Sequence, residues 1–311
     1  MMARSTYIPG TALDRLPSVR GALVPSAPMA NMTWFRVGGP AEVLFRPQDA
    51  EDLAEFLQGC PVDIPLTVIG VGSNLLIRDG GIDGVVIKLG RQFAYTKTEG
   101  SELVAGAVAS DVNVALTACE AGIAGLEFLR GVPGTIGGAV RMNAGAYGAE
   151  VKDVLVSARA LDRQGRLHDV SVDALGFEYR HCAAPKDWIF TEAKFRGIAG
   201  DPDEIQARMG KISTERSGTQ PVKSRTGGST FKNTDTARAW ELIDQAGCRG
   251  LVIGDAQVSE QHCNFLINRG NATADDLETL GDTVRQRVME ASGVELHWEI
   301  RRIGKPQEGR K

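Results

Sequence analysis

The chain of 311 residues is poor in the features that mark membrane, secreted and nucleic-acid-binding proteins. It has no apolar run near the roughly 18–20 residues that a membrane-spanning helix needs, and its N-terminus lacks the apolar core of a signal peptide. The formal net charge is −4 at pH 7, so the chain lacks the excess of basic residues that is typical of nucleic-acid-binding proteins. We therefore expect a cytoplasmic protein that neither inserts into membranes nor binds nucleic acid as its main partner.

Cysteine and histidine are also scarce, and their spacing does not suit a metal. The five cysteines are odd in number, scattered and without a CxxC pair, so we expect reduced thiols that serve as small core residues. The four histidines are scattered too, and His181 and His262 each stand beside a cysteine without the spacing of metal ligands. The sequence thus predicts no metal site.

Glycine, in contrast, is abundant, and it is densest in GVPGTIGGAVRMNAGAYG (131–148). Glycine permits positive φ angles and a close approach of the main chain to other groups, and a run of bare N–H groups suits an anion such as a pyrophosphate. The flanks are apolar, whereas a solvated linker would be rich in serine and charge. The run predicts a buried loop built around a ligand. A second glycine-bearing loop, GVGSNLLIRDGG (70–81), fits either the same interpretation or a plain β-turn.

Hydrophobic periodicity predicts a chain in which short strands and helices are mixed. Ser110 is a candidate N-cap, and Thr273 and Asp276 have the spacing of a capping box. The segment GIAGDPDE (197–204) is the best domain boundary because it is small, polar and contains proline. We expect helices over 49–58, 111–121, 202–216, 236–246 and 274–291, and strands over 41–45, 65–70, 84–89, 103–108, 154–161, 167–170, 189–195, 251–254, 264–268 and 294–304.

Ser229 is a candidate proton donor because of its setting in GGSTFKN (227–233). Two glycines precede it, and Lys232 follows three residues later. A fixed ammonium would stabilise the serine alkoxide and make the hydroxyl a better donor. A solvated loop serine is the plain alternative. The segment is not a nucleophile elbow, since Phe231 occupies the place of the second glycine.

Glu299 is a candidate acid on the last predicted strand. Alternation with period two places it opposite the apolar face formed by Val294, Leu296, Trp298 and Ile300. A carboxylate beside an aromatic ring on such a strand can be desolvated, which raises its pKa. An edge strand with a wet, charged face is the alternative.

Two further segments offer polar recognition groups. FEYR (177–180) places Arg180 directly after an aromatic residue. Arginine can bind a carboxylate through two parallel hydrogen bonds. The alternative is a surface arginine that stacks on Tyr179. VSEQHCNFLIN (258–268) supplies Gln261, His262 and Asn264. These side chains suit a sugar or a uracil, and they suit a capped turn equally well.

These segments stand in one order along nearly the whole chain, together with TWFRVGGPAE (33–42), AWELIDQAG (239–247) and HWEIRRIG (297–304). In that order the chain resembles the UDP-N-acetylenolpyruvoylglucosamine reductase family, flavoenzymes that make UDP-N-acetylmuramate for peptidoglycan. The resemblance implies an α+β fold with two FAD-binding subdomains of the vanillyl-alcohol-oxidase (PCMH) type, over 20–90 and 91–200. A substrate-binding α/β domain (201–304) and a tail (305–311) follow. We expect a monomer.

The resemblance also implies site residues. Contacts to FAD are expected from Gly70, Gly72, Ser73, Asn74, Gly131, Pro133, Gly134, Gly137, Gly138, Asn143 and Gly145. Contacts to the substrate, UDP-N-acetylglucosamine enolpyruvate, are expected from Lys232, Asn233, Gln261, His262 and Asn264. Arg180, Ser229 and Glu299 fall on the catalytic positions of the family.

The implied reaction is a reduction with NADPH as the electron donor. Hydride from reduced FAD goes to the terminal carbon of the enol ether, and negative charge develops on the neighbouring carbon and its carboxylate. Arg180 stabilises that charge electrostatically, and a protonated Glu299 donates a hydrogen bond to it. Ser229 supplies the proton.

The chain departs from the family pattern in two places. His181 and Cys182 follow Arg180, where the family usually has aspartate and serine, so the surroundings of the arginine differ. Residues 181–228 contain no tyrosine, so the chain resembles the branch (type II) that lacks the lid loop with a substrate-covering tyrosine. Another flavin oxidase would not need GGSTFKN and HWEIRRIG. A non-catalytic nucleotide-sugar-binding protein would not need Arg180, Ser229 and Glu299.

Overall fold

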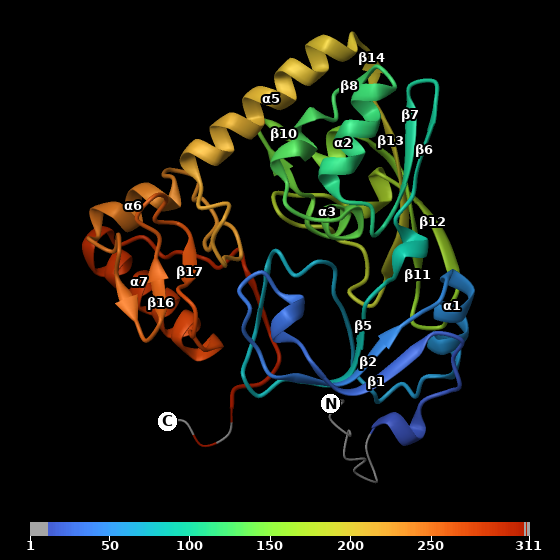
Figure 1. The fold of residues 1–311 in the computed structure, drawn as a ribbon, viewed down its shortest axis with the longest axis horizontal. Coiled ribbons are helices and arrows are strands. Elements are labelled where there is room, and N and C mark those ends of the chain that lie inside the picture. The colour runs from blue at the N-terminus through green and yellow to red at the C-terminus, as the bar shows by residue number, and fades with distance from the viewer. Residues whose placement is uncertain (1–11, 308, 310–311) are drawn as a thin grey trace. The chain divides into compact units, whose positions relative to one another are not determined.

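The computed structural model describes residues 12–307 and 309, and its elements are drawn in Figure 1. The chain forms two compact units, and neither is continuous in sequence. The first consists of the residues up to Pro25, Val43–Gly70 and Gly84–Glu215, and the second of Ser26–Glu42, Val71–Asp83 and the residues from Arg216 onward. The predicted division into three domains and a tail stays a prediction.

The first unit contains most of a four-stranded sheet and a complete five-stranded sheet. In sheet order, the strands of the first are β1 (Ala22–Pro28), β2 (Pro40–Arg46), β5 (Ile82–Ile87) and β3 (Leu66–Val68). Those of the second are β12 (Leu167–Ser171), β11 (Leu155–Leu161), β13 (Ile189–Arg196), β7 (Glu102–Gly106) and β6 (Thr96–Glu99). Two short pairs complete the unit, β9 (Gly145–Ala146) with β10 (Ala149–Glu150) and β8 (Ile123–Ala124) with β14 (Ile198–Ala199).

The helices of the first unit pack against these sheets. They are α1 (Ala50–Gly59), α2 (Asp111–Glu120), α3 (Ile136–Met142), α4 (Val151–Val154) and α5 (Pro202–Thr219), whose last turn leads into the second unit. Short 3-10 helices lie at Ala12–Arg15, Arg91–Phe93, Glu127–Gly131 and Asp173–Leu175. Helices α2 and α3 lie against the five-stranded sheet, where Figure 1 shows them beside β7 and β13. The strands bury alternate residues on that side, such as Leu103 and Phe195, as period two requires.

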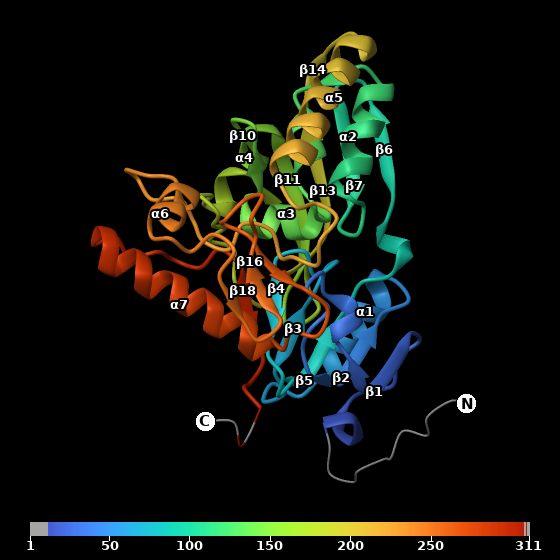
Figure 2. The same ribbon diagram turned by 60° about the vertical axis from the view of Figure 1, so that its left-hand side comes forward.

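The second unit is smaller and is built from three separated pieces of chain. Its elements are the 3-10 helix Ala30–Met32, β4 (Leu75–Ile77), α6 (Ala239–Gln245), β15 (Val252–Ile253), β16 (Ala256–Val258), β17 (Leu266–Asn268), α7 (Ala274–Ser292) and β18 (Arg301–Ile303). Strands β15, β16 and β17 form one antiparallel sheet, and β18 pairs in parallel with β4. Figure 2 shows α7 running beside this group, and its apolar face packs on β15 and β16.

One core joins the three pieces of the second unit. Phe35 from the first piece, Leu76 from the second and Phe231 from the third all belong to it, and each is at most 1% exposed. Burying a large apolar side chain contributes about 1.5–3 kcal/mol relative to leaving it exposed. The early segments TWFRVGG and GVGSNLLIR therefore help to stabilise the C-terminal third of the protein.

The predicted helices and most predicted strands are confirmed, with mixed helix and sheet content as expected. Ser110 accepts a hydrogen bond from the Asn113 N–H at 3.1 Å, as an N-cap does. Thr273 and Asp276 form the predicted capping box of α7. All five cysteines are buried free thiols. Among the described helices, none combines the length and apolar character needed to cross a bilayer.

Two predictions about local structure were wrong. The glycine-rich run is not a loop throughout, because residues 136–142 form α3, which buries Ile136, Ala139 and Val140 in the core. The predicted strand over 294–304 is regular only at β18, although Leu296 and Ile300 are buried as its alternation predicted. Residues 294–300 lack a continuous partner strand, since Trp298 forms only an isolated bridge to Phe231.

Candidate active site

The glycine-rich run is tied to the start of α2 by backbone hydrogen bonds. The Asp111 N–H donates to the Gly134 carbonyl at 3.2 Å, and the Ile136 N–H donates to the Ala109 carbonyl at 3.0 Å. Gly137 allows this close approach, because a Cβ there would lie 3.0 Å from the Ala107 Cβ. The run is thus fixed in place from the protein interior.

Asp111, at the start of α2, has a carboxyl group in an unusual environment. Its side chain is fully buried, and neither carboxyl oxygen has a hydrogen-bond partner within the described part of the chain. Burial raises the pKa of Asp111 well above its ordinary value, although the Gly134 backbone opposes the shift. The carboxyl group therefore gives up its proton less readily than an exposed aspartate does.

Arg180 lies against the end of the glycine-rich run. Its Nη2 donates a hydrogen bond to the Gly145 carbonyl at 2.9 Å, and its guanidinium lies 4.8 Å from the centre of the Tyr179 ring. Asn143 is fully buried, and both polar atoms of its amide contact protein groups. Asn143 was assigned to FAD from the sequence, and this geometry favours a role in holding the protein chain.

Gly70 and its neighbours fall into both units. The Gly70 carbonyl, in the first unit, accepts a hydrogen bond from Lys88 Nζ at 2.6 Å. Gly72, in the second, has φ +70°, and a Cβ there would lie 2.3 Å from the Met32 carbonyl oxygen. Glycine is therefore required at position 72 for packing against the segment that follows Met32, whether or not a ligand is bound.

Ser229 and Glu299 lie on two adjoining segments of the second unit. The Glu299 N–H donates to the Thr230 carbonyl at 2.8 Å, and Ser229 forms an isolated bridge to Phe265. Both Ser229 and Glu299 are half-buried. Asn74 joins this group, because its Nδ2 donates to the Glu299 carbonyl at 3.2 Å. The structure thus brings together two of the three predicted catalytic residues and one predicted cofactor residue.

Asn264 fixes the segment that carries Ser229 by two hydrogen bonds to the Phe231 backbone. Its Oδ1 accepts a hydrogen bond from the Phe231 N–H at 3.0 Å, and its Nδ2 donates to the Phe231 carbonyl at 2.9 Å. The side chain is 4% exposed. For Asn264, predicted to contact substrate, this geometry favours the alternative of a structural turn residue. The hydroxyls of Thr226 and Thr230, also buried here, have no hydrogen-bond partner among the described residues.

The other predicted substrate residues surround this segment. The Lys232 N–H donates to the His297 carbonyl at 2.8 Å, and Asn233 Oδ1 accepts from the Ala239 N–H at 3.0 Å at the start of α6. Gln261 Nε2 donates to the Gly218 carbonyl at 3.0 Å. Burial lowers the pKa of His262, so its imidazole is neutral at pH 7.

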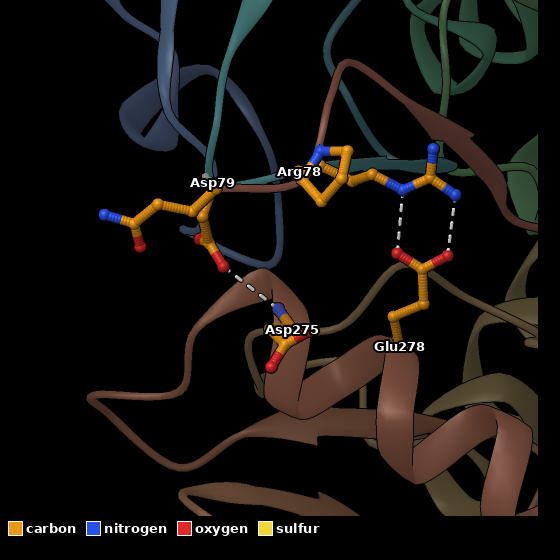
Figure 3. A pocket seen from close by; sticks show the side chains of 6 residues that line it. Arg78, Asp79, Asp275 and Glu278 are labelled. Atoms are coloured by element: carbon orange, nitrogen blue, oxygen red, sulfur yellow. Dashed lines mark hydrogen bonds and ion pairs between the residues drawn. The ribbon is translucent and has the colours of Figure 1, made fainter. Parts of the chain in front are cut away.

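A small cavity lies at the start of α7 in the second unit, and its lining includes none of the predicted site residues. Figure 3 shows the side chains that line it, with Arg78 paired to Glu278 and Asp79 joined to the start of α7. Arg78 forms two hydrogen bonds with Glu278 and lowers the pKa of that carboxyl. Asp79 accepts from the N–H groups of Ala274 and Asp275, both at 3.0 Å. The Arg-Asp pair of GVGSNLLIRDGG therefore caps and anchors α7.

The geometry of two glycines fits an FAD-binding surface. A Cβ at Gly138 would meet no heavy atom within 4 Å, and one at Gly70 would meet only Thr135 Oγ1, at 3.1 Å. Bare backbone thus faces open space at both positions, as a closely approaching nucleotide requires.

Comparison with known proteins agrees with this arrangement. Residues 41–171 match the profile described as FAD binding domain, and residues 220–303 match that of the UDP-N-acetylenolpyruvoylglucosamine reductase C-terminal domain. The UDP-N-acetylenolpyruvoylglucosamine reductase of Azorhizobium caulinodans is 62% identical over 291 residues, 94% of each chain. That of Parvibaculum lavamentivorans is 61% identical over 292 residues, again 94% of each chain.

The chain belongs to the UDP-N-acetylenolpyruvoylglucosamine reductase family. The crystal structure of UDP-N-acetylenolpyruvylglucosamine reductase (MurB) from Thermus caldophilus superposes with a TM-score of 0.79 at 34% identity. The match covers 92% of this chain and 99% of that one. The predicted family, its FAD cofactor and its oxidoreductase class are confirmed.

The family matches separate the predicted FAD residues from the predicted substrate residues, although Gly72, Ser73 and Asn74 belong to the second unit. The predicted FAD residues fall in 41–171, and Ser229, Glu299 and the predicted substrate residues fall in 220–303. Arg180 lies in neither matched region. Sequence reasoning missed Asp111 and Glu150 altogether. A lone aspartate at the first helical position and a glutamate after a glycine-rich run carry no local signal of burial.

Proposed function

We propose that this protein reduces UDP-N-acetylglucosamine enolpyruvate to UDP-N-acetylmuramate in peptidoglycan precursor synthesis, with NADPH as the electron donor. Family membership at 62% identity supports the activity. The observation that carries the assignment of roles is the junction of Ser229 and Glu299, whose segments are joined by the hydrogen bond from Glu299 N–H to Thr230 O at 2.8 Å. At this junction, a hydroxyl group and a carboxyl group lie on neighbouring backbone segments.

We propose that FAD, when bound, would supply the redox chemistry by which a hydride originating from NADPH reaches the terminal carbon of the enol ether. The residues of the chain supply the proton and stabilise the developing negative charge. The Ser229 hydroxyl gives its proton to the neighbouring carbon, so that one hydride and one proton add across the double bond. Arg180 stabilises the negative charge that spreads into the substrate carboxylate, and Glu299 donates a hydrogen bond to the same charge when protonated.

The proposed binding residues divide into those that contact the cofactor and those that contact the substrate. We propose that Gly70 and Gly138 present bare backbone to the cofactor, with the other predicted loop residues around them. Lys232, Asn233, Gln261 and His262 are the proposed substrate contacts. The absence of tyrosine from residues 181–228 supports membership of the branch without the lid loop. We further propose a cytoplasmic monomer that acts on this small molecule alone and does not bind nucleic acid.

Two half-reactions observed separately test this proposal. The holoenzyme is reduced anaerobically with NADPH, and UDP-N-acetylglucosamine enolpyruvate is then added while the flavin absorbance is followed. Rapid return of oxidised flavin is the expected result. Flavin that is reduced by NADPH and stays reduced after addition of the substrate would assign the protein to another oxidation–reduction reaction.

A further inference from the structure

The guanidinium of Arg180 is held by two residues that face each other across a short β-pair. Strands β9 and β10 pair Gly145 with Glu150. Arg180 Nη2 donates to the Gly145 carbonyl at 2.9 Å, and Nη1 lies 3.8 Å from Glu150 Oε1. The side chains of Arg180 and Glu150 are only 18% and 21% exposed. A charge pair in these partly buried surroundings is screened less than one at the surface.

Glu150 is itself fixed by its neighbours. Its Oε2 accepts a hydrogen bond from Asn143 Nδ2 at 3.1 Å and lies 2.9 Å from Lys152 Nζ. Asn143 Nδ2 also donates to the Glu178 carbonyl at 3.0 Å, and Asn143 Oδ1 accepts from the Lys152 N–H at 3.0 Å. The buried amide of Asn143 thus joins the carboxylate of Glu150 to the turn that carries Arg180.

That turn is tight and strained. Glu178 and His181 exchange two backbone hydrogen bonds, each 3.1 Å long, with Arg180 between them at φ +53°. A non-glycine residue in this left-handed region costs on the order of 1 kcal/mol or more, and such strain persists only where surrounding contacts determine it.

Gly145 provides the space for the pair. A Cβ at position 145 would lie 2.7 Å from Glu150 Cγ and 3.2 Å from Arg180 Nη1. Any side chain at this position would therefore push the carboxylate and the guanidinium apart. The terminal part of the glycine-rich run has a purpose here other than contact with a nucleotide.

From these contacts we propose that Glu150, held by Asn143, is a positioning residue for Arg180. The proposal rests on the assigned role of Arg180 in stabilising the substrate carboxylate. Arginine has a long, flexible stem, and its contribution to a developing charge depends on a fixed orientation before the reaction. Glu150 supplies that orientation through its charge, and the Gly145 carbonyl supplies it through a hydrogen bond.

The test replaces Glu150 by its neutral isostere and follows both half-reactions anaerobically. In Glu150→Gln, reduction of the flavin by NADPH is expected at the wild-type rate, with the same FAD content. Reoxidation by UDP-N-acetylglucosamine enolpyruvate is expected to slow about 10- to 100-fold. Asp153→Asn is the matched control, because it neutralises a carboxylate close in sequence that accepts a hydrogen bond from the Glu150 N–H at 2.8 Å. This control is expected to leave both rates unchanged.

A double-mutant cycle separates positioning from a general structural role. If Glu150 acts through Arg180, adding Glu150→Gln to Arg180→Lys causes no further loss of the reoxidation rate. Independent, multiplicative losses overturn the proposal, as does equal slowing of both half-reactions. Glu150→Asp, which keeps the charge, is expected to recover part of the rate if the glutamine variant loses FAD or unfolds. Failure of the wild-type enzyme to reoxidise with the substrate overturns the proposed function instead.

Discussion

Arg180 and Ser229 are held in place by different means. Around Arg180, neighbouring side chains fix the functional side chain, through the partly buried Glu150 and the fully buried Asn143. Around Ser229, hydrogen bonds fix the backbone, through the Phe265 bridge and the Asn264 clamp on Phe231. The length of the functional group explains the contrast. A serine hydroxyl follows its backbone closely, whereas a guanidinium at the end of a flexible stem needs restraint at its tip.

The largest expected effect is on chemistry at Ser229. In Ser229→Ala, the rate of flavin reoxidation by substrate is expected to fall about 10²–10⁴-fold, because a general acid is lost. Reduction of the flavin by NADPH is expected to be unchanged, which anaerobic stopped-flow spectroscopy measures directly. Ser224→Ala, in the same loop, is the control and should behave as wild type. Equal losses in both half-reactions would make Ser229 structural.

The next effect concerns the two hydrogen bonds between the Asn264 side chain and the Phe231 backbone. Asn264→Leu leaves the buried N–H and C=O of Phe231 without partners, and we expect it to lower the free energy of unfolding by about 2–4 kcal/mol. Urea unfolding of the holoprotein measures this loss. Asn271→Leu, at an exposed position of the same unit, is expected to change stability by less than about 0.5 kcal/mol. Similar values for the two variants would show that the clamp does not hold the Ser229 segment.

A smaller, pH-dependent effect is expected at Asp111, in the unit that carries Arg180. Because burial raises the pKa of Asp111, the folded protein keeps this proton at pH values where the unfolded chain has lost it. The wild type therefore loses stability as pH rises above the pKa of the unfolded chain, about 4, until the folded pKa is reached. Asp111→Asn removes this dependence. Its advantage over the wild type in chemical unfolding should grow as the pH rises from 5 toward 8, and a constant difference would contradict a raised pKa of Asp111.

The smallest effect is expected beside Ser229. The Thr230 hydroxyl is buried and has no hydrogen-bond partner among the described residues, so Thr230→Val removes a polar group without breaking a hydrogen bond to any of them. We expect this variant to match the wild type or exceed it by up to about 1 kcal/mol, at every pH from 5 to 8. Thermal unfolding measures the difference. A loss above about 1 kcal/mol would show that the hydroxyl has a partner, such as water.

Features that depend on neighbours in sequence could be predicted from the sequence, and features that depend on distant partners could not. The capping box of α7 and the Ser110 cap of α2 each lie within four residues, so local chemistry determines them. The segment 294–300 alternates like a strand, but its structure depends on residues near 230, which supply too few partners. Helix α3 was missed because two glycines disfavour a helix that tertiary packing nonetheless stabilises.

The same distinction applies to the site. The motifs marked Arg180, Ser229 and Glu299, because each residue is itself a chemical group of the right type. Nothing in the motifs distinguishes Asn143 as a side chain that supports Glu150, or Asn264 as one that supports Phe231. An asparagine has the same pattern in sequence whether it binds a ligand or the backbone. Only the placement of its amide atoms decides between the two.

The three-piece core of the second unit has a consequence for the order of folding during synthesis. Phe35 and Leu76 emerge from the ribosome early, but the residues that cover them come from Arg216 onward. These early segments must remain without their final partners until the last third of the chain has been made, and contacts of such long sequence separation form slowly. A fragment that begins at Arg216 would lack the core residues Phe35, Val37 and Leu76. The second unit is therefore a product of the complete chain.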